Sequence, residues 1–152
     1  MLVKALLESK PKEIITAKPA TSIDEAMDLL ISKGIGCLPV MDQNDKLVGI
    51  LSDKDIFKRI HETKGEYHKL SVEDVMSTDL IIGLPDDDIT YIAGVMDKNW
   101  IRHIPVLEGD TLIGLISLRD IIKTQTKNID IENRYLNMYM DMSHRRDKSG
   151  DE

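Results

Sequence analysis

The sequence predicts a mixed α/β (α+β) fold in which two β-α-β-β-α units pack with pseudo-twofold symmetry, flanked by a short N-terminal helix and a C-terminal helical tail. The main observation is an internal repeat of a strand, a second strand and a helix start. Pro105 lies 66 residues after Pro39, whereas Gly114 lies 65 residues after Gly49. The second copy therefore lacks one residue, which we place in a turn. Hydrophobic periodicity supplies the second observation.

In the first copy, residues 13–16 are largely apolar and β-branched and predict a short strand. Thr21 or Ser22 is the expected N-cap of the helix that follows. Residues 37–41 and 46–51 predict a hairpin, because turn-forming residues separate two apolar runs. The apolar positions of the predicted helix fall on one face: Ile23, Ala26, Met27, Leu30 and Ile31.

The second copy repeats this order. Residues 80–82 predict the first strand, and residues 104–107 and 112–116 predict the hairpin. Ser52 and Ser117 are expected to open the last helix of the two copies. The helix that precedes the second hairpin has one apolar face: Ile89, Ile92, Ala93 and Met96.

These elements divide the chain into four parts. Residues 1–61 hold the N-terminal helix and the first copy, 62–79 form a link, 80–125 hold the second copy, and 126–152 form the tail. One copy is too small for a secure core, so the two copies are expected to share one.

Two short helical signals lie outside the repeat. Ser71 followed by Asp74 resembles a capping box and predicts a helical turn in the link. In the tail, a helical stripe with a packing role is expected, and the polar residues 143–152 are expected to be disordered. The stripe consists of Ile131, Tyr135, Met138 and Met142.

Composition excludes several classes of function. The net charge of −7 argues against broad binding to nucleic acid or to anionic membranes, which requires a basic face, although a local basic pocket remains compatible with it. No apolar run reaches the roughly 18 residues of a membrane span. The single cysteine, Cys37, cannot form an internal disulfide, which favours a cytoplasmic location.

Two Ser-x-x-Asp motifs carry the strongest functional signal, because each follows a Gly-apolar-apolar strand end and opens a helix. A helix N-terminus offers free N–H groups and partial positive charge to a phosphate, and a serine hydroxyl adds a donor. A carboxylate three residues later can accept two hydrogen bonds from the vicinal hydroxyls of a ribose. The residues are Ser52, Lys54 and Asp55, and Ser117, Arg119 and Asp120.

The same pattern has a structural explanation. Ser-x-x-Asp at a helix start is also a capping box, and a duplication copies a cap as readily as a binding site. The two interpretations are compatible for the serines. They compete for Asp55 and Asp120.

Each copy contains a Pro-Val strand followed by a Gly-apolar-apolar-Ser-x-x-Asp ending. The occurrence of both motifs in this order in two copies resembles the CBS domain pair, named for cystathionine β-synthase. The resemblance covers roughly residues 4–125 and, in the absence of an attached catalytic domain, is to the stand-alone prokaryotic proteins of this family. It implies a regulatory module, not an enzyme, that binds AMP, ADP, ATP, NAD or S-adenosylmethionine in two clefts. It also implies a homodimer, formed through exposed helices into a flat disc, that acts on an unknown downstream protein.

The resemblance implies roles for individual residues. Asp55 and Asp120 would hold ribose hydroxyls, and Ser52 and Ser117 would meet phosphate. The residues implied beside the base are Thr16, Ala17, Gly36 and Cys37 in one cleft, and Ile82, Arg102, His103 and Ile104 in or beside the other.

The copies differ in charge. Residues 86–88 are three aspartates before the helix of the second copy, where they are expected to cap that helix; near a cleft they would repel a polyphosphate unless Mg²⁺ intervened. Arg102 and His103 replace Gly36 and Cys37 of the first copy, which predicts either that the two clefts prefer different ligands or that one cleft stays empty.

Two alternative functions remain open. One is a small metal-dependent nucleotide hydrolase that uses the acidic run 86–88, although no nucleophile–base pair can be placed from the sequence. The other is a structural dimerisation domain without a ligand.

Overall fold

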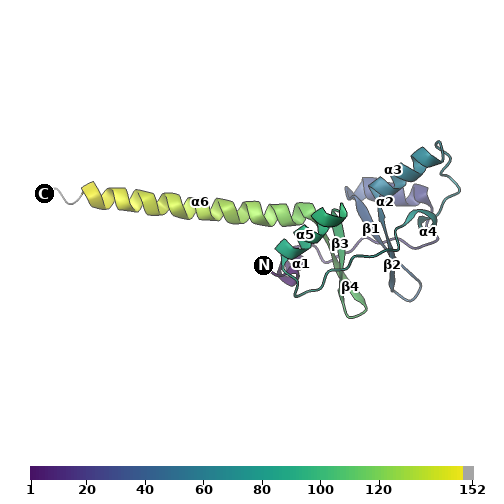
Figure 1. The fold of residues 1–152 in the computed structure, drawn as a ribbon, viewed down its shortest axis with the longest axis horizontal. Coiled ribbons are helices and arrows are strands. Elements are labelled where there is room, and N and C mark those ends of the chain that lie inside the picture. The colour runs from purple at the N-terminus through teal and green to yellow at the C-terminus, as the bar shows by residue number, and fades with distance from the viewer. Residues whose placement is uncertain (149–152) are drawn as a thin grey trace.

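The computed structural model describes the backbone of residues 1–148 and the side chains of residues 1–142. Two hairpins lie beside each other, helices cover them, and one long helix projects from the body (Figure 1). The elements in chain order are α1 (Val3–Glu8), α2 (Ile23–Lys33), β1 (Cys37–Met41), β2 (Leu47–Ser52), α3 (Asp53–Glu62), α4 (Val72–Val75), α5 (Ile89–Asn99), β3 (His103–Glu108), β4 (Thr111–Ser117) and α6 (Leu118–Lys148).

The two hairpins have matching registers, which confirms the repeat. Strands β1 and β2 pair antiparallel, as do β3 and β4, and each pair has a register shift directly after the Pro-Val dipeptide. Beyond this shift, five residues separate the paired Met41 and Leu47, but four separate Leu107 and Leu112. The residue missing from the second copy is therefore missing from the turn, as predicted.

The strands predicted at 13–16 and 80–82 are wrong, because pairing is limited to the residue after each. Ala17 bridges Val40, and Gly83 bridges Val106, both in parallel. The Ala17 N–H donates to the Pro39 carbonyl at 2.9 Å, and the Ala17 carbonyl accepts from Met41 N–H at 2.9 Å. A proline two residues further on in each copy ends the pairing, because it has no N–H to donate.

The single core expected for the two copies is wrong, because the buried hydrophobic residues form two clusters, one in each copy. The short helices also join the copies differently from the sequence boundaries. Val72 and Val75 of α4 lie in the core of the first copy, whereas Val3 and Leu6 of α1 lie in the core of the second. The helical turn predicted in the link is thus confirmed as α4. The N-terminal helix, assigned by sequence to the first copy, packs on the second.

Equivalent backbone hydrogen bonds fix these two short helices. The Val3 N–H donates to the Asp87 carbonyl, and the Val72 N–H donates to the Thr21 carbonyl, each at 2.8 Å. Asp87 follows Thr21 by the repeat distance of 66 residues. Helices α1 and α4 therefore take the same place in the two copies, although their sequences differ.

The helical faces are narrower than their apolar residues suggest. In α2, Ile23, Ala26 and Leu30 are buried as predicted, but Ile31 is 79% exposed. Phe57 of α3 is 76% exposed as well. A helix that covers one side of a small hairpin contacts it along a narrow stripe, so apolar residues at the edge of that stripe stay outside.

Helix α6 runs without interruption from Leu118 to Lys148, so the last helix of the second copy and the expected helical tail form one continuous helix. The disorder predicted for 143–148 is wrong for the backbone, which is helical, and residues 149–152 lie outside the described residues. Within the described chain, no helix has the length and apolar character to cross a membrane.

Gly49 allows another segment to cross β2. A Cβ at this position would meet the Met76 side chain and, at 3.1 Å, the Ser77 backbone oxygen. We expect Gly49→Ala to lower the free energy of unfolding by about 1–3 kcal/mol through overpacking.

Gly94 of α5 is the matched control, because nothing lies within 4 Å of its added Cβ. Gly94→Ala should raise the free energy of unfolding by about 0.5–1 kcal/mol, as alanine is the better helix former. Urea unfolding measures both variants, and equal effects would contradict the close crossing at β2.

Candidate functional site

Both Ser-x-x-Asp motifs are capping boxes. The Asp55 N–H donates to Ser52 Oγ at 3.1 Å, and the Ser52 N–H donates to Asp55 Oδ2 at 3.1 Å. Ser117 and Asp120 exchange the same two bonds, at 2.9 and 3.1 Å. Each box uses only the Oδ2 atom of its carboxylate, so the cap does not prevent Oδ1 from accepting hydrogen bonds from a ligand.

A cleft of about 1280 Å³ lies between the two copies. Its walls come from the N-terminal segment, the starts of β1 and β3, strand β4 and the first turn of α6. The residues on which the argument below depends are Lys10, Gly36, Asp53, Arg102, His103, Ser117 and Asp120. Both copies therefore contribute to one cavity.

The cleft brings together half of the residues chosen from sequence. Those that line it are Gly36, Cys37, Arg102, His103, Ser117, Arg119 and Asp120. Those that do not line it are Thr16, Ala17, Ser52, Lys54, Asp55, Ile82 and Ile104. Ile104 is fully buried and Ala17 nearly so, which places both side chains in the cores.

The prediction that Gly36 and His103 belong to separate clefts is wrong, because the structure places the two residues side by side. A Cβ on Gly36 would lie 3.5 Å from His103 Cε1 and 3.2 Å from Asp53 Oδ2. Corresponding backbone bonds fix the two strand starts: Asp53 N–H donates to the Gly36 carbonyl, and Leu118 N–H to the Arg102 carbonyl. The pseudo-twofold relation brings equivalent strand ends together, which the sequence could not show.

Lys10 is the main site residue that sequence reasoning missed. Its Nζ donates to Asp120 Oδ2 at 2.6 Å and to the Leu115 carbonyl at 2.7 Å. The sequence signal was the Lys-Pro-Lys run at residues 10–12, which has no counterpart in the second copy. Only the packing of α1 on the second copy brings this lysine to Asp120.

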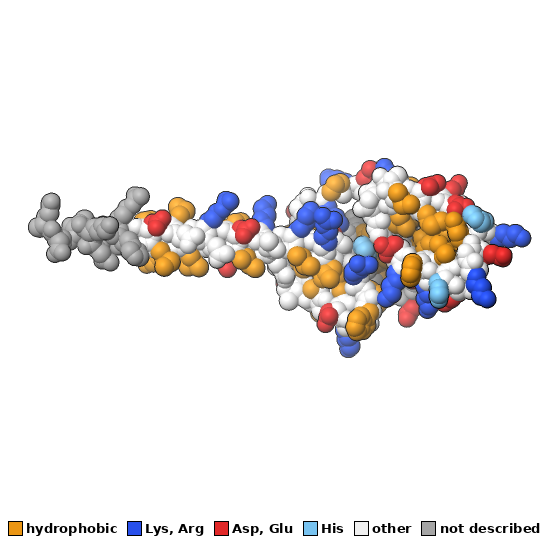
Figure 2. Space-filling model, turned by 90° about the horizontal axis from the view of Figure 1, so that it is seen from above, with side chains coloured by type: hydrophobic (Ala, Val, Ile, Leu, Met, Phe, Trp, Pro, Cys, Tyr) orange, Lys and Arg blue, Asp and Glu red, His pale blue; other side chains and the backbone are white. Residues whose placement is uncertain are grey.

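The cleft carries a local excess of positive charge. Six cationic residues line it: Lys4, Lys10, Lys12, Arg102, Arg119 and Lys123. Four acidic residues line it: Glu8, Glu13, Asp53 and Asp120. The cleft is thus net positive in a chain of net charge −7. Figure 2 shows Lys and Arg side chains gathered where α6 joins the body.

Asp120 and His103 are two of the cleft residues whose pKa is shifted. Burial opposes ionisation of Asp120, but hydrogen bonds from Lys10 and from the Ser117 backbone hold the pKa of its carboxyl below the ordinary value. Burial, aided by the neighbouring Arg102 charge, lowers the pKa of His103. At neutral pH the site therefore presents a carboxylate and an uncharged imidazole.

Cys37 lies in the cleft wall but is unsuited to nucleophilic chemistry. Burial, together with the carboxylates of Asp55 and Asp53, raises the pKa of its thiol to about 12. Only the thiolate is an effective nucleophile, so Cys37 acts as a small packing residue here.

The three aspartates before α5 have structural partners. Asp88 accepts from the Thr90 N–H at 2.8 Å and caps the helix, as predicted. Asp87 accepts from the Leu84 N–H at 2.8 Å, and Asp86 pairs with Lys4 at 2.8 Å. They do not line the cleft. Among the described residues, no group of three potential metal ligands occurs.

We expect Asp120→Asn to lower the free energy of unfolding at pH 7 by about 1–2 kcal/mol, because the Lys10 contact and part of the cap are lost. The folded-state pKa of this group is lowered, so its contribution is fully present above the unfolded value and is lost as pH falls through the folded value. The difference between wild type and variant should shrink below about pH 4 in urea titrations. A difference that does not change with pH would contradict the assignment.

Comparison with known proteins gives one family. The family model described as CBS domain matches residues 9–62 and 72–127. The CBS domain-containing protein YhcV of Bacillus subtilis is 29% identical over 126 residues, which make up 83% of this chain and 89% of YhcV.

Two further comparisons concern an enzyme and a ligand complex. The inosine-5'-monophosphate dehydrogenase of Methanocaldococcus jannaschii is 34% identical over 122 residues, but these span 80% of this chain and only 23% of the dehydrogenase. The CBS domain pair of protein MJ0100, solved in complex with 5'-methylthioadenosine and S-adenosyl-L-methionine, is 32% identical and superimposes with a TM-score of 0.74. That match covers 84% of this chain and 98% of the other.

Proposed function

Because this chain belongs to the CBS-domain family and carries two CBS motifs, we propose that it is a regulatory module that binds an adenosine-containing molecule in the cleft between them. The observation that carries the proposal is the position of Asp120. Its carboxylate lines a net-positive cleft and keeps one oxygen outside the capping box. The free carboxylate oxygen can accept hydrogen bonds from the two hydroxyls of a ribose, and the positive charge of the cleft suits an anionic group next to that ribose.

The remaining walls suit the other parts of such a ligand. Ile14, Ile35 and Leu115 provide an apolar surface for a flat base. Arg102 is well exposed, and its nearest carboxylate, Asp53, lies 3.9 Å away, so its guanidinium is available for phosphate. The bound complex of MJ0100 supports adenosine as the common part of the ligand.

The two motifs are not equivalent in this proposal. Asp55 does not line the cleft, and its bonds are with the capping serine Ser52. Asp120 has the same cap and faces the cleft. We therefore assign the ribose contact to Asp120 and propose AMP, ADP or ATP as ligands, with NAD and S-adenosylmethionine as further candidates and Mg²⁺ accompanying a polyphosphate.

The proposal describes a cytoplasmic, non-enzymatic regulator. The chain matches only the CBS part of the dehydrogenase relative, so that enzyme's activity is not transferred to it. The hydrolase alternative loses its main support, since residues 86–88 contact Lys4 and the start of α5. A homodimer that acts on a downstream protein completes the proposal.

The ribose assignment predicts unequal effects of two equivalent substitutions. Asp120→Ala and Asp55→Ala each remove the aspartate of a capping box, but only Asp120 lines the cleft. We expect Asp120→Ala to weaken AMP binding by about 1–3 kcal/mol, the range for a lost hydrogen bond to a charged group.

Asp55→Ala should bind AMP as the wild type does. Calorimetric titration with AMP measures both variants, after circular dichroism has shown that they are folded. Unchanged affinity of Asp120→Ala, or equal losses in the two variants, would refute the ribose contact. If no adenosine compound binds the folded wild type, the sensor proposal itself fails.

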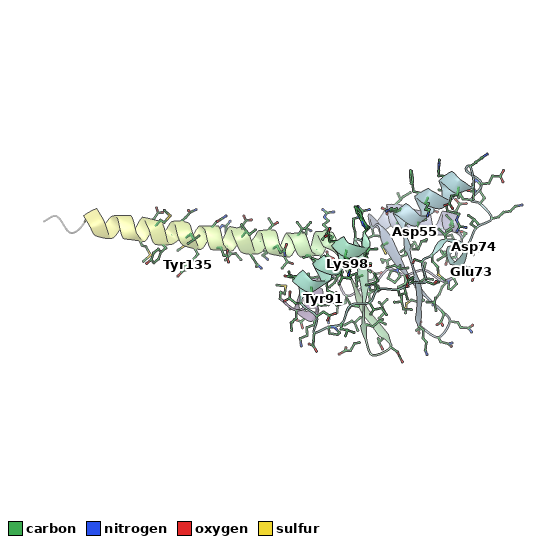
Figure 3. All side chains as sticks on the ribbon, in the orientation of Figure 1. Asp55, Glu73, Asp74, Tyr91, Lys98 and Tyr135 are labelled. Atoms are coloured by element: carbon green, nitrogen blue, oxygen red, sulfur yellow. The ribbon has the colours of Figure 1, made fainter. Side chains whose placement is uncertain are left out.

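The phosphate assignment predicts a dependence on ligand charge. Arg102→Gln should weaken ATP binding about tenfold, because one charge-assisted hydrogen bond is lost, and should leave binding of uncharged 5'-methylthioadenosine unchanged. Lys98→Gln, on α5 and outside the cleft, is the control cation (Figure 3). Equal losses for both ligands would indicate a structural role for Arg102.

A further inference from the structure

Helix α6 extends far beyond the body of the molecule. Ile121 is buried in the second core, but every described side chain from residue 125 to residue 142 is exposed. Figure 1 shows this part of the helix standing clear of the two copies, and Figure 3 shows Tyr135 projecting from it far from the hairpins.

This exposed helix is unusually apolar. Eight of the fourteen residues from 129 to 142 are large and apolar, and each is more than half exposed: Ile129, Ile131, Tyr135, Leu136, Met138, Tyr139, Met140 and Met142. Hydrophobic side chains follow the projecting helix in Figure 2. Helices in water owe most of their stability to packing of an apolar face, so this face requires a covering surface.

One stripe of the helix has coiled-coil spacing. Ile131, Tyr135, Met138 and Met142 alternate at four, three and four residues, the a/d pattern of a heptad with d at 131 and 138. The preceding a position is Asn128. A single polar residue at an a position is the usual device for fixing the register of a pair of helices.

The charged residues beside the stripe favour a second copy of the same helix, in parallel orientation, as the partner. In this register Lys127 is a g position and Glu132 the e position that faces it across a parallel pair. A second copy would thus form two Lys127–Glu132 ion pairs by symmetry. An antiparallel pair would place Glu132 against Glu132 and Arg134 against Arg134, which like-charge repulsion opposes.

We propose that α6 is a dimerisation helix that forms a parallel two-stranded coiled coil with α6 of a second copy through Ile131, Tyr135, Met138 and Met142. The contact holds two bodies at the same end of the coil. It does not depend on the ligand, so its failure would leave the nucleotide proposal unaffected.

Cysteine cross-linking of the full chain tests the geometry. Cys37 is buried and poorly reactive, so an introduced thiol dominates the reaction. Ile131→Cys places the two thiols face to face in a parallel pair, and we expect disulfide-linked dimers under mild oxidation.

Asn133→Cys, on the outer f position, is the matched control and should remain mostly unlinked. Equal cross-linking of the two variants would overturn the proposal. Preferential linking of Ile131→Cys to Tyr135→Cys in a mixture would also overturn it, since those positions meet only in an antiparallel pair.

Sedimentation equilibrium tests the energetics. Ile131→Asp should weaken self-association about 100-fold, because a carboxylate would be buried in the seam, whereas Asn137→Asp on the polar face should not. Both sites are exposed within one chain, so neither variant should disturb its fold.

Exchange of the flanking charges completes the test. Lys127→Glu alone should weaken association several-fold, and adding Glu132→Lys should restore it. A wild type that stays monomeric, or a double variant no better than the single one, would refute the parallel coil.

Discussion

The Asp120 carboxylate joins three parts of the molecule that lie far apart in sequence. It accepts a hydrogen bond from the N–H of Ser117, directly before α6, and another from Lys10 of the N-terminal segment. It also lines the cleft. The cost of placing this partly buried carboxylate is offset by those hydrogen bonds, which also hold its pKa low. The start of the long helix, the path of the N-terminal segment and the proposed contact to a ribose all involve this one group.

The two copies differ mainly in the segment that precedes each bridge. Val3 and Val72 occupy equivalent places, and fourteen residues lead from Val3 to Ala17 but eleven from Val72 to Gly83. The three extra residues allow the N-terminal segment to bring Lys10 over β4, beside Asp120. The two hairpins are nearly identical, but the two aspartates thereby acquire different surroundings. Asp120 is paired with Lys10, whereas Asp55 exchanges hydrogen bonds with the capping serine Ser52.

This arrangement links the cleft to the projecting helix. Asp120 is in the first turn of α6, so a ligand that takes a hydrogen bond from the Lys10–Asp120 pair acts at the base of the helix whose far part carries the coiled-coil stripe. The buried Cys37 and the uncharged His103 add packing and polarity to the cleft without reactive chemistry.

The sequence by itself determined the repeat, the two hairpins, the capping boxes and the stripe on the tail. These features follow from local spacing: Ser52 and Asp55 are one helical turn apart wherever the chain goes. Tertiary structure alone decided which copy each short helix joins, that Gly36 and His103 share one cavity, and that Lys10 reaches Asp120. Such contacts depend on how the two copies pack, and a pattern of neighbours along the chain contains no information about the relative placement of distant segments.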